Sequence, residues 1–280
     1  MFVLKAGGTR EFFNKKKIAS SLVKIGMDKE WAKGVADEIR AGFKRKTVSS
    51  DEIFDLVLEK LKPFGNVYLG KYNLRRAVMD LGPTGYPFEK YIARVLEEYG
   101  YQAKTNQFID GFCVRHEIDV LAEKDKSHFI VECKYHNTRG ARSDLKVALA
   151  LWARWLDIQR KWEKEAWHPE KYHGVWLITN TKCTSEAIKY AECVEMLITS
   201  WGYPGEMSLE KLIYKKQLYP VNIFPGKEYQ RFYYRLGQER IYLSRDLLKH
   251  SAKELAKMLN AKELETQNWL DRARELVNHE

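Results

Sequence analysis

Two carboxylates and one lysine lie on two neighbouring predicted strands near the middle of the chain. Asp119 belongs to the first strand, Arg115–Ala122, and both Glu132 and Lys134 belong to the second, His128–Tyr135. Residues two apart on a strand point to the same side, so Glu132 and Lys134 face together. Two carboxylates and an amine on an otherwise apolar sheet cost free energy unless they are paired or bind an ion.

This set of side chains suits the hydrolysis of a phosphodiester. Carboxylate oxygens are hard ligands for Mg²⁺ (or Mn²⁺), and the ion neutralises the phosphate and activates water. A lysine can position or deprotonate that water, or stabilise the developing negative charge. The simpler alternative is a surface ion pair between Glu132 and Lys134 on an edge strand. Their apolar neighbours Val131 and Cys133 favour a buried strand instead.

A predicted series of helices and strands positions this set. A five-residue polar turn at 123–127 joins the two strands and places Asp119 roughly opposite Glu132. Apolar spacing predicts further helices and strands at Pro87–Tyr99, Ser143–Lys161, Val175–Ile178, Thr184–Glu195 and Met196–Ile198. Elements in this order predict a mixed sheet flanked by helices.

The motif and its surroundings resemble the PD-(D/E)XK nucleases, and among them the Mrr-type restriction endonucleases. The resemblance rests on an Asp followed a dozen residues later by Glu-x-Lys, on Phe88-Glu89 opening a helix, and on Gly100-Tyr101 ending it. It covers roughly residues 84–202 and implies a restriction-endonuclease-like fold that acts on DNA. It also assigns roles to four residues: Asp119 and Glu132 as metal ligands, Lys134 as the catalytic lysine, and Glu89 as an acidic support of the metal site.

A competing metal site is suggested by two pairs with zinc-ligand spacing. These pairs are Cys113 with His116 and Cys133 with His136. Residues three apart in a straight strand face opposite sides, and both pairs straddle the acidic motif. The sequence therefore favours the carboxylate site, and we expect no stoichiometric zinc.

The N-terminal segment carries most of the chain's basic excess. The net charge is +10, and residues 1–82 hold 17 Lys and Arg against 10 Asp and Glu. Such a surface suits a polyphosphate partner, although an ordinary solvated surface has the same charge. Two short strands are predicted, at Phe2–Lys5 and Phe12–Phe13. Helices follow around Ile18–Ile25 and Trp31–Ile39, and a third starts after the N-cap residues Ser49-Ser50-Asp51 and is ended by Pro63.

This segment resembles the ATP-cone, a small nucleotide-binding regulatory domain, in Val3, Lys5, Gly8, Glu11, Phe13, Lys17 and Ile18. The resemblance implies a regulatory adenine nucleotide, ATP or dATP. It places Lys5 and Lys17 on the phosphates, and Glu11, Phe13 and Ile18 around the nucleotide. After Lys5 the family usually has arginine, where this chain has Ala6. No P-loop pattern is present, so we expect binding without hydrolysis. The alternative is that Lys15–Lys17 only begin a solvated helix.

The last segment is predicted to be helical. A capping-box pattern at Ser251–Glu254 opens one helix, and a second carries apolar residues from Trp269 to Val277. The pair resembles a helix-hairpin-helix DNA-binding unit, and ordinary helix packing is the alternative. Four tryptophans earlier in the chain could stack on bases, but core packing is favoured for them. They are Trp152, Trp155, Trp162 and Trp167.

Together these features predict an α/β (α+β) protein of three segments. Residues 1–82 form an ATP-cone of short strands and helices, 83–202 a nuclease domain with a mixed sheet flanked by helices, and 203–280 a helical segment. The turn-rich residues 81–85 mark the first boundary. No apolar run approaches the roughly 20 residues that cross a membrane. No secretory signal is recognisable, so we expect a cytoplasmic protein.

The expected function is that of a nucleotide-regulated, Mg²⁺-dependent deoxyribonuclease of the restriction or repair kind. DNA and an adenine nucleotide are the expected partners, and self-association is a further expectation. The alternative is a nucleotide-sensing DNA-binding regulator whose nuclease fold no longer cuts. An ATP-cone transcriptional regulator is disfavoured, because the paired Cys-x-x-Cys motifs of its zinc ribbon are missing.

Overall fold

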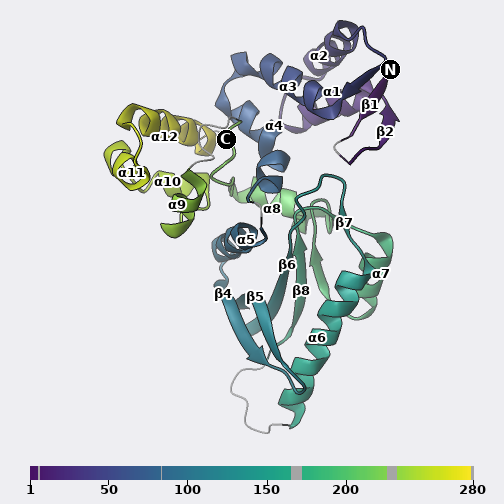
Figure 1. Cartoon of the computed structure of the whole chain (residues 1–280), viewed down its shortest axis with the longest axis vertical. Coiled ribbons are helices and arrows are strands. Elements are labelled where there is room, and N and C mark those ends of the chain that lie inside the picture. The colour runs from purple at the N-terminus through teal and green to yellow at the C-terminus, as the bar shows by residue number, and fades with distance from the viewer. Residues whose placement is uncertain (6, 83, 165–171, 226–231, 279–280) are drawn as a thin grey trace. The chain divides into compact units, whose positions relative to one another are not determined.

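The structure is a computed structural model that describes residues 1–5, 7–82, 84–164, 172–225 and 232–278 (Figure 1). Its chain divides into two compact units. The first unit comprises Met1–Ala77, Thr138–Gly140 and Pro220–Glu280, and the second comprises Val78–Asn137 and Ala141–Tyr219. The predicted domain boundaries at 82 and 202 stay a prediction. Three residues considered above, Ala6, Pro83 and Trp167, lie outside the described residues.

The N-terminal part of the first unit is a small sheet with four helices. The sheet has the order β2-β1-β3, in which β1 pairs antiparallel with β2 and parallel with β3. The strands are β1 (Phe2–Leu4), β2 (Arg10–Phe12) and β3 (Thr47–Ser49). The helices are α1 (Lys15–Lys24), α2 (Lys29–Gly42), α3 (Ser50–Leu61) and α4 (Asn66–Met79). The two predicted strands and three predicted helices are present, whereas β3 was not predicted.

The start of α3 shows how local sequence sets these elements. The Ser49 Oγ accepts the Glu52 N–H at 3.0 Å, and the Glu52 carboxylate accepts the Ser49 N–H at 2.9 Å. This capping box satisfies two of the N–H groups that a helix start leaves open. The helix ends at Leu61, and Pro63 lies in a short 3-10 turn, Lys62–Phe64. The helix therefore starts at Ser50, within the predicted run of N-cap residues, and ends just before Pro63 as predicted.

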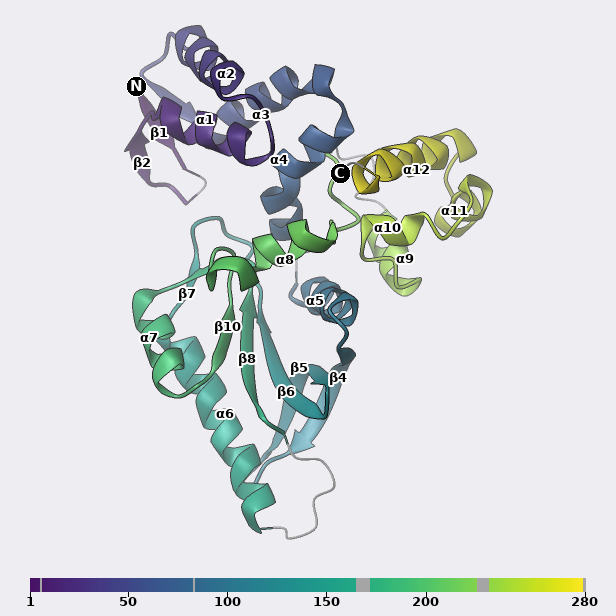
Figure 2. The same ribbon diagram turned by 180° about the vertical axis from the view of Figure 1, so that it is seen from behind.

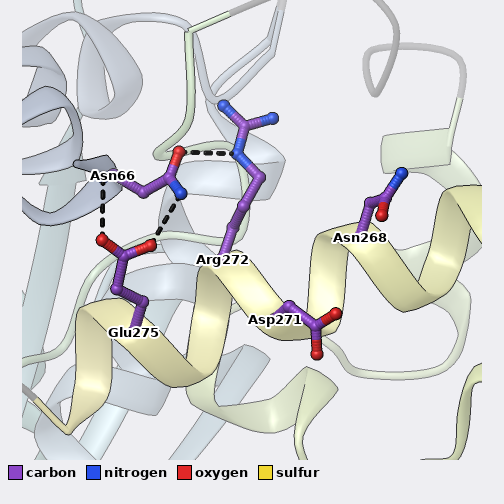
Figure 3. Close-up of a pocket in the computed structure, with 5 residues that line it drawn as sticks. All are labelled: Asn66, Asn268, Asp271, Arg272 and Glu275. Atoms are coloured by element: carbon purple, nitrogen blue, oxygen red, sulfur yellow. Dashed lines mark hydrogen bonds between the residues drawn. The ribbon is translucent and has the colours of Figure 1, made fainter. Parts of the chain in front are cut away.

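The C-terminal part of the first unit is helical, as predicted. Its helices are α9 (Tyr233–Gln238), α10 (Ser244–Leu247), α11 (Ala252–Leu259) and α12 (Glu263–Val277). The predicted capping box at Ser251 and Glu254 opens α11. On α12, Glu275 accepts the Asn66 backbone N–H at 3.0 Å and the Asn66 side-chain amide at 2.7 Å, so it caps the first residue of α4 (Figure 3).

The second unit contains the predicted mixed sheet. Its strand order is β10-β8-β6-β5-β4, with β10, β8 and β6 parallel and β6, β5 and β4 antiparallel. The elements are α5 (Tyr86–Glu98), β4 (Gln102–Asp110), β5 (Arg115–Lys124), β6 (Ser127–Lys134), β7 (Arg142–Ser143), α6 (Leu145–Lys164), β8 (Gly174–Thr179), β9 (Lys182–Cys183), α7 (Ser185–Cys193), β10 (Leu197–Thr199) and α8 (Leu209–Lys216). The strand β10 forms one edge, with α7 beside it (Figure 2).

Helices cover both faces of this sheet. Ala148, Leu151 and Ile158 of α6 share a buried core with Ile130 and Leu177, and α5 packs against β4, β5 and β6. Trp155 is buried in the α6 core, and Trp152 and Trp162 pack against it. Packing is thus the role of these three tryptophans, as the sequence favoured. In the described part of the chain, no helix is long and apolar enough to cross a membrane.

The hairpin between β5 and β6 corrects one prediction. The pairing reaches Lys124 with Ser127, which leaves a turn of two residues, Asp125 and Lys126, with φ of 50° and 64°. Two successive positive φ angles are typical of a type I′ hairpin turn, whose twist matches that of the strands. The predicted five-residue turn was therefore wrong. The tighter turn extends both strands toward the tip of the hairpin.

Candidate active site and nucleotide-binding residues

Asp119 lies at the point where β5 and β6 stop pairing. The last pair of the ladder is Val120 with Val131, and the next residues along the two strands are Asp119 and Glu132. In place of a ladder bond, the Asp119 Oδ2 accepts the backbone N–H of Cys133 at 2.7 Å. The two predicted metal ligands are therefore neighbours on adjacent strands, with Asp119 half-buried and held by the backbone of β6.

The carboxyl groups around Asp119 disfavour one another's ionisation. Burial and the negative charges of Glu132 and Glu89 raise the pKa of Asp119 to about 7, against the opposing effects of the Cys133 N–H and of Arg154. Burial, Glu117 and Glu132 likewise raise the pKa of Glu89, which begins α5. Glu89 is therefore close enough to Asp119 and Glu132 for their charges to interact, and its role in a metal site stays a prediction. Carboxyl groups that repel one another in a partly buried place are a common feature of functional sites.

Glu132 also has a cationic partner that the sequence did not reveal. The Arg154 Nη1 on α6 donates to the Glu132 Oε2 at 2.5 Å, and the side chains are 30% and 23% exposed. Lys134 follows two residues later at the end of β6, where it pairs with Thr179 of β8. By strand alternation its side chain lies on the same side as that of Glu132. Arg154 therefore contacts one of the predicted metal ligands, and the role of Lys134 stays a prediction.

The residues suit Mg²⁺ by their chemistry. Asp119 and Glu132 offer carboxylate oxygens, the ligands that Mg²⁺ prefers, and their mutual repulsion would be relieved by a divalent cation. One Glu132 oxygen is bonded to Arg154, which leaves the other for a ligand. Among the described residues, no group of three or more His, Cys, Asp or Glu side chains is arranged to hold a metal. The fit therefore rests on the donor pair.

The Cys and His pairs weighed as zinc ligands are bonded to different groups. Asp157 lies 2.8 Å from the His116 Nε2 and raises the pKa of the Cys113 thiol by hydrogen bonding to it. The Cys133 thiol is buried, which raises its pKa. The His136 Nε2 contacts the Ser143 Oγ at 3.0 Å.

The predicted nucleotide-binding residues also meet, in the first unit. The Glu11 carboxylate lies 2.6 Å from the Lys5 Nζ and 2.8 Å from the Lys17 Nζ, and hydrogen bonds from these lysines lower the pKa of Glu11. Ile18 belongs to the core of this part, and Phe13 packs against that core. Two lysines from different elements are therefore held together by one carboxylate, and a phosphate could compete for them.

Comparison with known proteins covers both units. A family described as the ATP cone domain matches residues 1–80. An uncharacterized protein from Archaeoglobus fulgidus is 42% identical over 135 residues, which are 47% of this chain and 70% of the relative. A crystal structure of a protein of unknown function, AF1548, is 31% identical with a TM-score of 0.58, over 70% of this chain and 99% of that one.

The chain belongs to the same family as this Archaeoglobus fulgidus protein. Its residues 1–80 match the ATP cone domain, which supports the predicted N-terminal domain and suggests nucleotide sensing. Neither relative's name states an activity. The nuclease assignment therefore depends on the site itself.

Two residues near the site, Glu117 and Arg154, were not predicted from the sequence, which carries a signal for only one of them. Glu117 lies two residues before Asp119 on β5, so strand alternation would have placed it on the same side. Arg154 lies on α6, and only the packing of that helix on the sheet brings it to Glu132. A single sequence carries no signal for such a contact.

Proposed function

We propose that this protein is a nucleotide-regulated, Mg²⁺-dependent deoxyribonuclease. The observation that carries the proposal is the partly buried acidic cluster around Asp119, where burial and neighbouring carboxylates raise the pKa of Asp119 to about 7 beside its 2.7 Å contact with the Cys133 N–H. Such a cluster destabilises a fold unless a cation or proton offsets it. The Glu-x-Lys spacing on the adjacent strand adds an amine two residues beyond Glu132. The ATP-cone supports control by a nucleotide.

The residues take distinct roles in this proposal. Asp119 and Glu132 hold the cation, which when bound would neutralise the phosphate and lower the pKa of a water molecule. Lys134 orients the attacking water or stabilises the charge that develops on the phosphate. Glu89 holds a proton or a further water beside the carboxylates. Arg154 orients the carboxylate of Glu132 through their ion pair.

A second candidate is a DNA-binding regulator whose site does not cut. The ion pair between Arg154 and Glu132 favours it, because a guanidinium already neutralises one of the two proposed ligands. In that case the ATP-cone would control DNA binding alone. The two candidates differ in one measurable respect, which is cleavage in the presence of a divalent cation.

Nicking of supercoiled plasmid by the purified chain tests the proposal. Cleavage should require Mg²⁺ or Mn²⁺, and Asp119→Asn and Lys134→Ala should each reduce the rate by roughly 100-fold or more. The matched controls are Asp125→Asn, at an exposed residue of the β5–β6 turn, and Lys182→Ala, at an exposed residue of β9. Both controls should cut like the wild type.

The results separate the two candidates. Cleavage that persists in Asp119→Asn would exclude this site as the catalytic centre. A wild-type protein that binds DNA but never cuts it, with either cation and with or without ATP, would favour the regulator.

A further inference from the structure

Two exposed aromatic rings flank the turn that joins β4 to β5. Phe108 and Phe112 are 55% and 41% exposed. The Arg115 guanidinium lies 4.8 Å from the centre of the Phe108 ring. Arg160 and Lys164 of α6 lie 4.4 Å and 4.2 Å from the centre of the Phe112 ring. We call these five residues the tip surface.

The turn that carries this surface is anchored on α6. The Asp157 carboxylate accepts hydrogen bonds from the backbone N–H groups of Cys113 at 2.8 Å and Val114 at 3.3 Å. The backbone oxygen of Asp157 accepts a hydrogen bond from the backbone N–H of Phe112 at 2.9 Å. A Cβ on Gly111 would lie 2.0 Å from the Asp157 Oδ2, so only glycine fits. The rings are thus presented on a constrained backbone, which lowers the entropy lost on binding.

The cations of the tip surface remain available to an anion. Within the described parts of the chain, Arg160 and Lys164 contact the Phe112 ring and pair with no carboxylate, and both are exposed. The Arg115 Nε lies 3.7 Å from the Asp110 Oδ1, which is a long distance for an ion pair, and both side chains are exposed. Such a pair contributes little and is easily exchanged for a phosphate. Lys161, on the next position of α6, adds a fourth cation and lies 3.6 Å from Asp110.

One stripe of α6 connects the tip surface to the acidic cluster. Arg154 bonds Glu132, Asp157 anchors the turn, and Arg160 and Lys164 reach Phe112. These positions recur every three or four residues and therefore share one side of the helix. From Arg154 to Lys164 the helix rises about 15 Å, roughly four to five nucleotide steps of one DNA strand. A strand lying along this stripe would reach both places.

We propose that the tip surface binds a DNA strand with unpaired bases and guides it toward the acidic cluster. Exposed rings stack on bases, which are accessible when unpaired, while the neighbouring cations contact phosphates. The choice of DNA rests on the proposed function. Paired bases hide their faces within the stack, so a duplex would use the cations but not the rings.

Binding of a short single-stranded oligonucleotide, compared with a duplex of the same length, tests this inference. Measurements use full-length protein with Asp119→Asn and no divalent cation, so that nothing is cut. Phe112→Ala should weaken single-strand binding by roughly 5- to 100-fold and duplex binding far less. The control is Leu156→Ala, which removes a similarly exposed apolar side chain from the same helix that carries Arg160 and Lys164.

A double charge variant tests the phosphate contacts. Arg160→Gln with Lys164→Gln should reduce the slope of log affinity against log salt by about 1.4 for a single strand, from two lost contacts. Lys182→Gln with Lys189→Gln removes two exposed charges on β9 and α7 and should leave the slope unchanged. Equal melting temperatures would show that all variants are folded.

Two results would overturn the inference. In one, the tip variants bind a single strand like their controls. In the other, the charge variant loses affinity while Phe112→Ala keeps it, so that bases do not stack there. Plasmid nicking is scored separately. If the protein binds single strands through the tip surface but does not cut plasmid, only the proposed function is refuted. If it cuts plasmid but the tip-surface variants bind a single strand like their controls, only this inference is refuted.

Discussion

Replacing Asp119 by asparagine should make the cation-free protein more stable at alkaline pH. The folded protein binds the Asp119 proton more tightly than the unfolded chain does, because its pKa is about 7 and that of a free aspartate is about 3.9. Stability is therefore lost as the pH rises between these two values. The substituted asparagine carries no charge at any of these pH values, and its side-chain oxygen can still accept the Cys133 N–H.

The size of the effect follows from the two pKa values. A shift of about three units corresponds to roughly 4 kcal/mol above pH 7, and about 1.5 kcal/mol of that is already lost at pH 5. The advantage of Asp119→Asn should therefore grow by about 3 kcal/mol between about pH 5 and pH 8.5.

Urea unfolding followed by tryptophan fluorescence, in EDTA, measures this difference at several pH values. The control Asp125→Asn makes the same substitution at an exposed turn residue with φ of 50°, which asparagine tolerates. It should show no pH-dependent gain. The reasoning fails if Asp119→Asn has no advantage at pH 8.5, or if its advantage is the same at pH 5. Adding Mg²⁺ should stabilise the wild type and not the variant, because only the wild type keeps both ligands.

Two other substitutions test the nucleotide site and the turn anchor. Lys5→Ala should weaken ATP or dATP binding by roughly tenfold or more in calorimetry, since it removes a charge-assisted contact beside Glu11. Absence of binding to the wild type at millimolar nucleotide would defeat the assignment. Gly111→Ala should cost about 1–3 kcal/mol, because its Cβ would lie 2.7 Å from the Val114 oxygen and closer still to Asp157. An unchanged free energy of unfolding in urea for Gly111→Ala would show that the β4–β5 turn can rearrange to accommodate the added methyl group.

Elements with strong local signals could be predicted from the sequence. The helix α5 has a continuous apolar face and ends at Glu98, two residues before Gly100, whose φ is 86°. The capping-box pattern at Ser251 predicted the start of α11, and the N-cap residues from Ser49 to Asp51 predicted the start of α3 to within two residues. The strands β5 and β6 alternate clearly enough to place Asp119 beside Glu132. In each case the information lies within a few neighbouring residues.

Other features depend on contacts between distant residues. The strand β4 is nine residues long but mostly polar, with only Ile109 buried, so its pairing with β5 decides its structure. The strand β3 has three residues and exists through its parallel pairing with β1. The contact of Arg154 with Glu132 requires the register of α6 on the sheet. No local sequence pattern specifies these strand pairings or this contact between a helix and the sheet.

The course of the chain limits how a nucleotide signal could reach the proposed active site. The chain leaves the first unit after Ala77 and returns to it at Pro220, and Thr138–Gly140 between these points also belong to the first unit. The helix α4 runs through the Ala77 junction to Met79. The Asn222 side-chain amide donates to the Ala77 oxygen at 2.8 Å, and that of Asn73 donates to the Ile223 oxygen at 2.7 Å. Both junctions are therefore tied together within the first unit. Coupling requires that the nucleotide bind two arrangements of the protein with different affinity. A change in the ATP-cone that moves α4 would act on the connections at Ala77 and Pro220 together, so we expect α4 to be one element through which such a signal passes.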